Sequence, residues 1–228
     1  MRKTANVLIF LIFVSLTAYG QTAADFNVTL NKTGDGVVIT GYTGKVAAVK
    51  IPAKIEGMPV KEIGKGAFSV NNTITSVVIP AGVTAVGDEA FNLCPKLTSV
   101  TLPDSLITMG NNVFPYSGLT AISIPKNIKS ISGGLLSDCR QLKSVTIPEG
   151  VTSIEPFAFS SCISLAEIKL PSTIKSIGEK AFEGCTSLAS ITIPDSAGTL
   201  TFGRDAFRWC DKLNLASQAL LKRRGYEI

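Results

Sequence analysis

The chain has 228 residues and a formal net charge of +5; 45% of its residues are hydrophobic and only 17% are charged. This length suits one ordinary domain or one short solenoid, and the apolar content excludes a chain that is disordered throughout. Because the chain has no histidine, histidine general bases, Ser-His and Cys-His nucleophile pairs and histidine metal ligands are all excluded.

The first twenty residues have the pattern of a secretory signal peptide. Two basic residues precede the apolar run Val7–Leu16, which is too short to span a bilayer. Ala18 and Gly20 place small residues at the −3 and −1 positions, so we expect cleavage after Gly20, with sites after Ala23 or Ala24 as alternatives. The predicted location is secreted, extracellular or at the cell surface, with the periplasm as the alternative. No later segment is long and apolar enough to cross a membrane.

The positive charge is concentrated at the two ends of the chain. Without the predicted signal peptide, 20 basic residues face 17 acidic ones. Lys222, Arg223 and Arg224 account for that excess. We therefore interpret the basic isoelectric point as an effect of the tail and predict no nucleic-acid partner.

Residues 21–45 precede the repeats and are predicted to form a β-hairpin cap. Phe26–Leu30 and Val37–Tyr42 both alternate between apolar and polar side chains, and the turn-forming segment Asn31–Gly36 lies between them. We expect this hairpin to cover the first coil, whose sheet edge would otherwise be open.

From residue 46 to residue 213 one phrase recurs, L-x-x-[VI]-x-[IL]-P-x-x-[VI]-T-x-[IV]-G-x-x-A-F-x-x-C. Its prolines from Pro80 to Pro194 are 22 or 23 residues apart. This period predicts a mainly β repeat solenoid, a right-handed leucine-rich-repeat coil of about seven 23-residue repeats, in which each coil packs against its neighbours. The aromatic position of the phrase, which we call the ring position, is occupied by Phe68, Phe91, Phe114, Leu136, Phe159, Phe182 and Phe207.

Each part of the phrase predicts a local structure. The [VI]-x-[IL] segment is a short strand that stacks in parallel on its counterparts and ends at the proline, which has no N–H to donate. A second short extended piece follows, and then a helical or 3₁₀ turn inserts the ring between coils. The glycine between them (Gly64, Gly87, Gly110 and Gly178) is expected to turn the chain with positive φ. Residues 214–228 are predicted to be a helical cap and basic tail, with a helix within Leu213–Arg224.

These residues resemble the leucine-rich repeats of the BspA-like, or Treponema-type, class, and the resemblance covers most of the chain after residue 45. It implies a secreted or surface protein with a binding role; such proteins are common in host-associated bacteria and also occur in some eukaryotic parasites. Several members of this class are adhesins that bind host matrix proteins, host cells or other bacteria. The resemblance implies no catalytic residue, because the repeated motif is structural.

Five cysteines occupy one repeated position, three residues after the ring position. Asn71 and Ser117 take the same position in other coils, so we expect a small side chain that hydrogen-bonds to the backbone. Free, buried thiols are the preferred interpretation; a bridge between neighbouring copies such as Cys162 and Cys185 is the alternative. No metal, cofactor or catalytic site is predicted, because no CxxC or Cys-His spacing occurs. The five are Cys94, Cys139, Cys162, Cys185 and Cys210.

The residues that flank the inward side chain of each predicted strand form the candidate protein-binding face. They are mostly Ser and Thr, without the Tyr, Trp or Arg of a strong hot spot, so we expect weak binding per site that multivalency strengthens. We hypothesise a monomeric, non-catalytic, adhesin-like module for protein ligands, host matrix or cell-surface proteins among them. The alternative function is that of a structural or scaffolding envelope protein. The alternative interpretation of the face is that Ser and Thr merely suit an exposed strand. The face comprises Lys50, Ser76, Val78, Ser99, Thr101, Ser123, Ser144, Thr146, Glu167, Lys169, Ser190 and Thr192, with Ala48 and Ala121 in the same rows.

Overall fold

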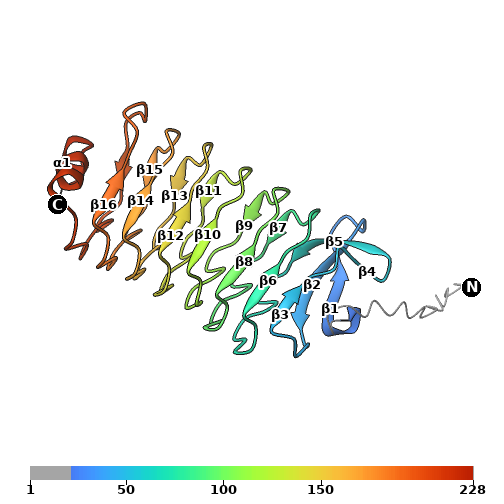
Figure 1. Cartoon of the computed structure of the whole chain (residues 1–228). Helices are drawn as coiled ribbons and strands as arrows, with labels where there is room; N and C mark the ends of the chain where they lie inside the picture. The colour runs from blue at the N-terminus through green and yellow to red at the C-terminus, as the bar shows by residue number, and fades with distance from the viewer. Residues whose placement is uncertain (1–21, 228) are drawn as a thin grey trace, which may run out of the picture.

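The computed structural model describes residues 22–227 and shows a solenoid whose coils follow one another along a single axis (Figure 1). The predicted signal peptide lies outside the described residues. Two rows of short strands run along the solenoid, and the apolar side chains of every coil join one continuous core. The prediction of a mainly β leucine-rich-repeat solenoid is confirmed.

An antiparallel hairpin starts the described chain, as predicted. A 3₁₀ turn, Ala23–Asp25, leads into β1 (Phe26–Leu30), which pairs with β2 (Val37–Tyr42). Strand β2 also pairs in parallel with β5 (Met58–Ile63), and this second partner joins the hairpin to the coils. A further hairpin, between β4 (Lys54–Ile55) and β5, was not predicted.

The first row of strands consists of the predicted [VI]-x-[IL] segments, each three residues long. Equivalent residues pair in parallel register, so that identical positions of successive coils lie side by side. The row is divided into three sheets, β3-β6-β8, β10-β12 and β14-β16. Its members are β3 (Ala48–Lys50), β6 (Ser76–Val78), β8 (Ser99–Thr101), β10 (Ala121–Ser123), β12 (Ser144–Thr146), β14 (Glu167–Lys169) and β16 (Ser190–Thr192).

The second row consists of two-residue strands that follow the prolines, as expected for the second extended piece. They extend β5 on the N-terminal side and form a separate four-stranded parallel sheet, β11-β13-β15-β17, on the C-terminal side. They are β7 (Ala85–Val86), β9 (Thr108–Met109), β11 (Ser130–Ile131), β13 (Ser153–Ile154), β15 (Ser176–Ile177) and β17 (Thr201–Phe202).

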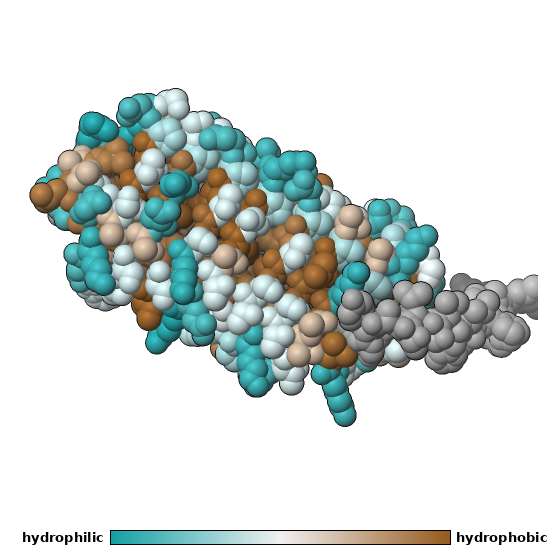
Figure 2. Space-filling view, in the orientation of Figure 1, coloured by the Kyte–Doolittle hydropathy of each residue, from teal (hydrophilic) through white to brown (hydrophobic). Residues whose placement is uncertain are grey.

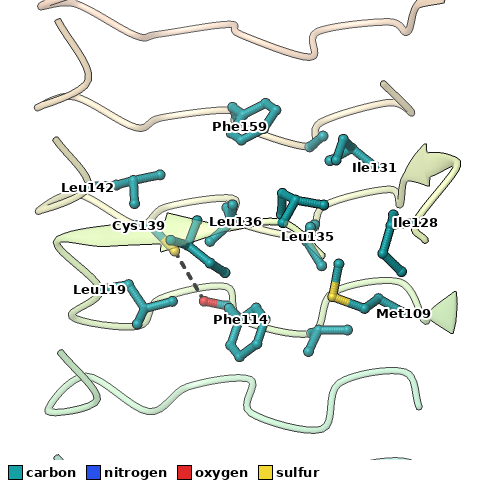
Figure 3. Packing of buried hydrophobic residues seen from close by; sticks show 14 of the residues in the cluster. Met109, Phe114, Leu119, Ile128, Ile131, Leu135, Leu136, Cys139, Leu142 and Phe159 are labelled. Atoms are coloured by element: carbon teal, nitrogen blue, oxygen red, sulfur yellow. Dashed lines mark hydrogen bonds between the residues drawn. The ribbon is translucent and has the colours of Figure 1, made fainter. Parts of the chain in front are cut away.

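The ring positions form a stack of side chains through the core. Successive phenylalanine rings lie parallel with their centroids 4.9–5.4 Å apart, as in the pairs Phe68–Phe91 and Phe159–Phe182. The aliphatic Leu136 interrupts the stack between Phe114 and Phe159 (Figure 3). Each phenylalanine removes a large apolar surface from water, which contributes roughly 1.5–3 kcal/mol.

We call the segment from two residues before to two residues after each ring position a ring turn. Within a ring turn, hydrogen bonds of the i to i+3 type close single turns, such as Ser69 N–H to the Gly66 carbonyl. Between coils, a ladder runs along the axis: the N–H groups of Gly66, Phe68 and Val70 donate to carbonyls of the next coil. The ring turns are therefore held both by these short-range bonds and by the neighbouring coil.

The prediction that the glycine between the second extended piece and the ring turn has positive φ is wrong. Gly64, Gly87, Gly110 and Gly178 do not have positive φ. A Cβ on Gly87 would lie 2.7 Å from the Lys65 nitrogen of the preceding coil. Glycine fits Gly87 because neighbouring backbones approach closely there, whereas Ser132 and Glu155 occupy the equivalent position in the fourth and fifth coils.

Positive φ occurs instead at the two ends of the ring turns. Residues such as Glu89 and Leu93 adopt it without being glycine. The left-handed conformation costs such residues roughly 1–2 kcal/mol each. The ladder to the next coil holds them in place.

The C-terminal segment closes the last coil. Helix α1 (Leu215–Arg223) begins at Asn214, whose side chain accepts from Ser217 N–H at 2.8 Å, and lies beyond the last strands (Figure 1). The Ser217 hydroxyl in turn accepts from the N–H of Ile191 in β16 at 3.0 Å. The predicted C-terminal helix is confirmed within two residues at each end. Within residues 22–227, no helix has the length and apolarity needed to cross a membrane.

Candidate protein-binding face

The structure places all the predicted face residues on the outward side of the first strand row. Between each outward pair lies a side chain that points into the core, such as Val77 in β6 and Ile168 in β14. Ser76 and Ser190 are half-buried, and the other members of the face are exposed. Parallel register aligns them in two rows, one led by Ala48 and one led by Lys50.

The chemistry of the face is dominated by hydroxyl groups and small side chains. Lys50, Glu167 and Lys169 are its only ionisable residues, and two of these lie together in β14. More widely, Figure 2 shows one side of the solenoid with apolar residues in a band along its length and hydrophilic residues on either side. A flat, weakly charged surface of this kind suits contact with a broad protein surface better than capture of a small molecule.

The cysteines form a structural ladder and no disulfide. All five are buried with free thiols. Each thiol lies 3.1–3.2 Å from the carbonyl oxygen of the preceding coil's ring position, as Cys139 does from Phe114 (Figure 3). Ser117, which takes the same position in the third coil, contacts this ladder through its hydroxyl, 3.2 Å from the Cys139 sulfur. The expectation of a small side chain bonded to the backbone is confirmed, and the disulfide alternative is wrong.

Burial makes these thiols poor nucleophiles. It raises the pKa of Cys94 from 9.0 to about 11 and that of Cys139 to about 12. The pKa of Cys162 is also well above its ordinary value, for the same reason. Among residues 22–227 there is no cluster of three or more His, Cys, Asp or Glu side chains that could hold a metal ion.

Sequence reasoning missed a second set of exposed residues, at the last position of the ring turns. Val70, Leu93 and Tyr116 lie there in three consecutive coils, and Trp209 lies there in the last one. All four are exposed apolar or aromatic side chains on backbone with positive φ. The signal in the sequence was a large apolar residue at a position that other coils fill with Asp138 or a smaller residue.

The chain belongs to the BspA-type leucine-rich repeat family. The profile of the BspA type leucine rich repeat region matches six copies, over residues 61–166 and 134–218. No curated protein sequence matches the chain.

Several solved structures share the fold. A leucine-rich repeat protein of Treponema pallidum is 31% identical, with a TM-score of 0.85 over 91% of this chain and 96% of that one. A leucine-rich cell surface protein of Faecalibacterium prausnitzii is 29% identical, with a TM-score of 0.56 over 75% of this chain and 53% of its own length. The pneumococcal vaccine antigen PcpA, at 19% identity and a TM-score of 0.63, shares the fold over 76% of this chain and 49% of its own length. The present chain thus spans about half of the latter two proteins.

Family and fold define a repeat protein consistent with a protein-interaction module. Proteins of this family and fold are generally non-catalytic. The residues that form the core are repeated from coil to coil.

Proposed function

We propose that this protein is a secreted or surface-exposed, non-catalytic module that binds host or bacterial proteins through the exposed face of the first strand row, in the manner of an adhesin. The observation that carries this proposal is the register of the face, which aligns exposed side chains of seven coils in two rows. Support for surface exposure comes from the signal-peptide pattern and from the similar protein of F. prausnitzii, which is described as a cell surface protein.

The experiment is a binding titration on immobilised extracellular-matrix proteins. The test variant carries Ser144→Ala, Thr146→Ala, Glu167→Ala and Lys169→Ala, which removes the centre of the face. The control carries Asp104→Ala and Lys126→Ala, an exposed ion pair of 2.9 Å that lies outside the strands. Both variants leave the net charge unchanged, so a difference between them reports the face itself.

We expect saturable binding by the parent and the control, and a loss of at least tenfold in affinity for the test variant, which corresponds to about 1.4 kcal/mol. Equal binding by all three proteins would place the contact elsewhere. An absence of saturable binding to any matrix or cell preparation would instead favour the second candidate, a structural envelope protein without a host ligand. The location is tested separately, by fractionation of the native cells into medium, periplasm and surface.

A further inference from the structure

The ring-turn ladder ends at the last coil with donors that have no acceptor. In each of the first six coils, three ring-turn N–H groups donate to carbonyls of the next coil at 2.7–3.1 Å. In the seventh coil the equivalent donors are those of Asp205, Phe207 and Trp209. Only Phe207 has a partner within residues 22–227, the hydroxyl oxygen of Tyr226 at 3.0 Å. The N–H groups of Asp205 and Trp209 are therefore left open on either side of it.

A cleft lies at this point, between the last ring turn and the C-terminal segment. It has a volume of about 490 Å³, within the usual range for ligand sites, and Asp205, Phe207, Trp209 and Tyr226 are among its lining residues. The cleft lies beside the three donors of the last ring turn, where an eighth coil would place its acceptor carbonyls. Tyr226 replaces only the middle one of the three missing acceptors.

The rim of the cleft has the composition of an interaction hot spot. Trp209, the only tryptophan of the chain, is 55% exposed and is stacked by the Arg208 guanidinium at 4.4 Å. Tryptophan and arginine are the residues most enriched where binding energy concentrates. The first strand row, by contrast, has neither residue on its outward side.

The charge of the cleft indicates the chemistry of the partner. Arg208 is paired with Asp205 at 3.6 Å. Asp211 and Glu227 also line the cleft, and neither has an ion-pair partner among the described residues. The site therefore presents two uncompensated carboxylates beside two backbone donors, a combination complementary to a cationic peptide.

We propose that this cleft binds a segment of a partner polypeptide that adopts the ring-turn conformation and carries a lysine or arginine side chain. Two carbonyls of this segment, four residues apart, accept hydrogen bonds from the N–H groups of Asp205 and Trp209. The carbonyls of Arg204 and Arg208 accept from N–H groups of the preceding coil in the same way. Its cationic side chain lies against the two free carboxylates. The pairing is analogous to strand addition at an open sheet edge, with a turn in place of a strand: main-chain bonds give affinity and side-chain contacts give selectivity. This site is separate from the first strand row and does not depend on the function proposed for that face.

The probe is the decapeptide with the sequence of residues 63–72, acetylated and amidated at its ends. It has the ring-turn sequence of the first coil, with a lysine at the position of the first acceptor carbonyl. Binding is followed by the fluorescence of Trp209 and by the amide-proton shifts of Asp205 and Trp209. The matched peptide has glutamate in place of Lys65.

We expect a saturable fluorescence change and downfield shifts of both amide protons. The dissociation constant should be millimolar or lower; the affinity is modest because a flexible peptide loses conformational entropy when it is ordered. The double variant Asp211→Asn/Glu227→Gln should bind roughly threefold more weakly, and the glutamate peptide more weakly still. The control Glu56→Gln/Asp104→Asn, far from the cleft, should bind as the parent does. Unchanged circular dichroism of both variants shows that they are folded.

Three results would overturn the proposal. One is no change in either signal up to about 5 mM peptide, a concentration at which even weak peptide ligands bind. The second is equal binding of both peptides to all variants, which would show no role for the carboxylates. The third is self-association of the protein in sedimentation that Trp209→Ala abolishes, which would make a second copy the occupant.

Discussion

At the scale of single residues, the glycine that precedes five of the seven ring turns allows neighbouring coils to approach closely. The φ angle of Gly87 is not positive, so the residue is not needed for its backbone conformation. A Cβ there would lie 2.7 Å from the Lys65 nitrogen and 3.0 Å from the Gly64 carbonyl carbon. Backbone atoms cannot move aside as a flexible side chain can. We therefore expect Gly87→Ala to destabilise the protein by about 1–3 kcal/mol, the usual cost of overpacking.

The measurement is urea denaturation followed by circular dichroism. Gly198→Ala is the matched control, since nothing lies within 4 Å of a Cβ at Gly198 and its φ is not positive. That variant should stay within about 0.5 kcal/mol of the parent. Equal effects of the two substitutions would contradict the role assigned to close backbone approach.

The buried thiols predict a loss of stability at alkaline pH. The pKa of Cys139 is about 12 in the folded chain and near 9.0 when the thiol is in water. Between these values the unfolded chain loses the proton and the folded chain keeps it, so rising pH favours unfolding. The thiol's contribution is complete below pH 9 and is lost as the pH approaches 12, at about 1.4 kcal/mol per pH unit.

Cys139→Ser tests this contribution, because Ser117 shows that the position accepts a hydroxyl. Unfolding free energies from urea titrations between pH 7 and pH 11 should fall less steeply for the variant than for the parent. Lysines and tyrosines titrate in both proteins and cancel in the comparison. Parallel pH profiles would show that the Cys139 thiol does not titrate differently in the folded and unfolded chains.

At the scale of elements, one arginine contributes strongly to holding the C-terminal cap on the last coil. The Arg224 guanidinium donates to the carbonyls of Ala197 at 2.7 Å and Pro194 at 2.8 Å, which follow β16. Arg224→Ala leaves these acceptors without their charged donor, and we expect a cost of about 2–3 kcal/mol. Faster hydrogen exchange of the β16 and β17 amides would report the loosening locally.

The adjacent Arg223 provides the control for that prediction. Its side chain is largely exposed, and it pairs with Asp195 at 3.7 Å. An exposed pair of this kind contributes less than about 1 kcal/mol. If Arg223→Ala and Arg224→Ala accelerated exchange equally, loss of charge rather than loss of the carbonyl contacts would be the cause.

The elements that could be predicted from the sequence are those whose structure is determined within one coil. The predictions failed for features that are determined by contacts between two coils. Alternation places Val77 inward and Ser76 outward without reference to any neighbour, so the strands and their exposed face were predictable. The role of Gly87 depends on the backbone of the coil before it, which a local pattern does not contain. The open donors of Asp205 and Trp209 depend on where the repeats stop and on Tyr226 folding back over the last coil.

At the scale of the whole molecule, stability should propagate from coil to coil, because each coil contacts mainly its neighbours. The stack of rings is already interrupted at Leu136, so Phe159 begins the C-terminal run of phenylalanines. Phe159→Ala removes a fully buried ring at the junction of the two runs, at a cost of about 3–5 kcal/mol. That cost is comparable with the total stability of a typical domain, roughly 5–15 kcal/mol, so the two halves should unfold separately.

Trp209 makes this prediction measurable, since it is the only tryptophan and lies in the last coil. In Phe159→Ala, its fluorescence should report unfolding at a lower urea concentration than circular dichroism, which averages over all coils. Phe68→Ala, an equally buried ring in the first coil, is the control and should leave the Trp209 transition near that of the parent while the N-terminal coils unfold early. Coincident transitions by both probes in both variants would mean that the solenoid unfolds as one cooperative unit, with coupling between coils stronger than the loss of one ring.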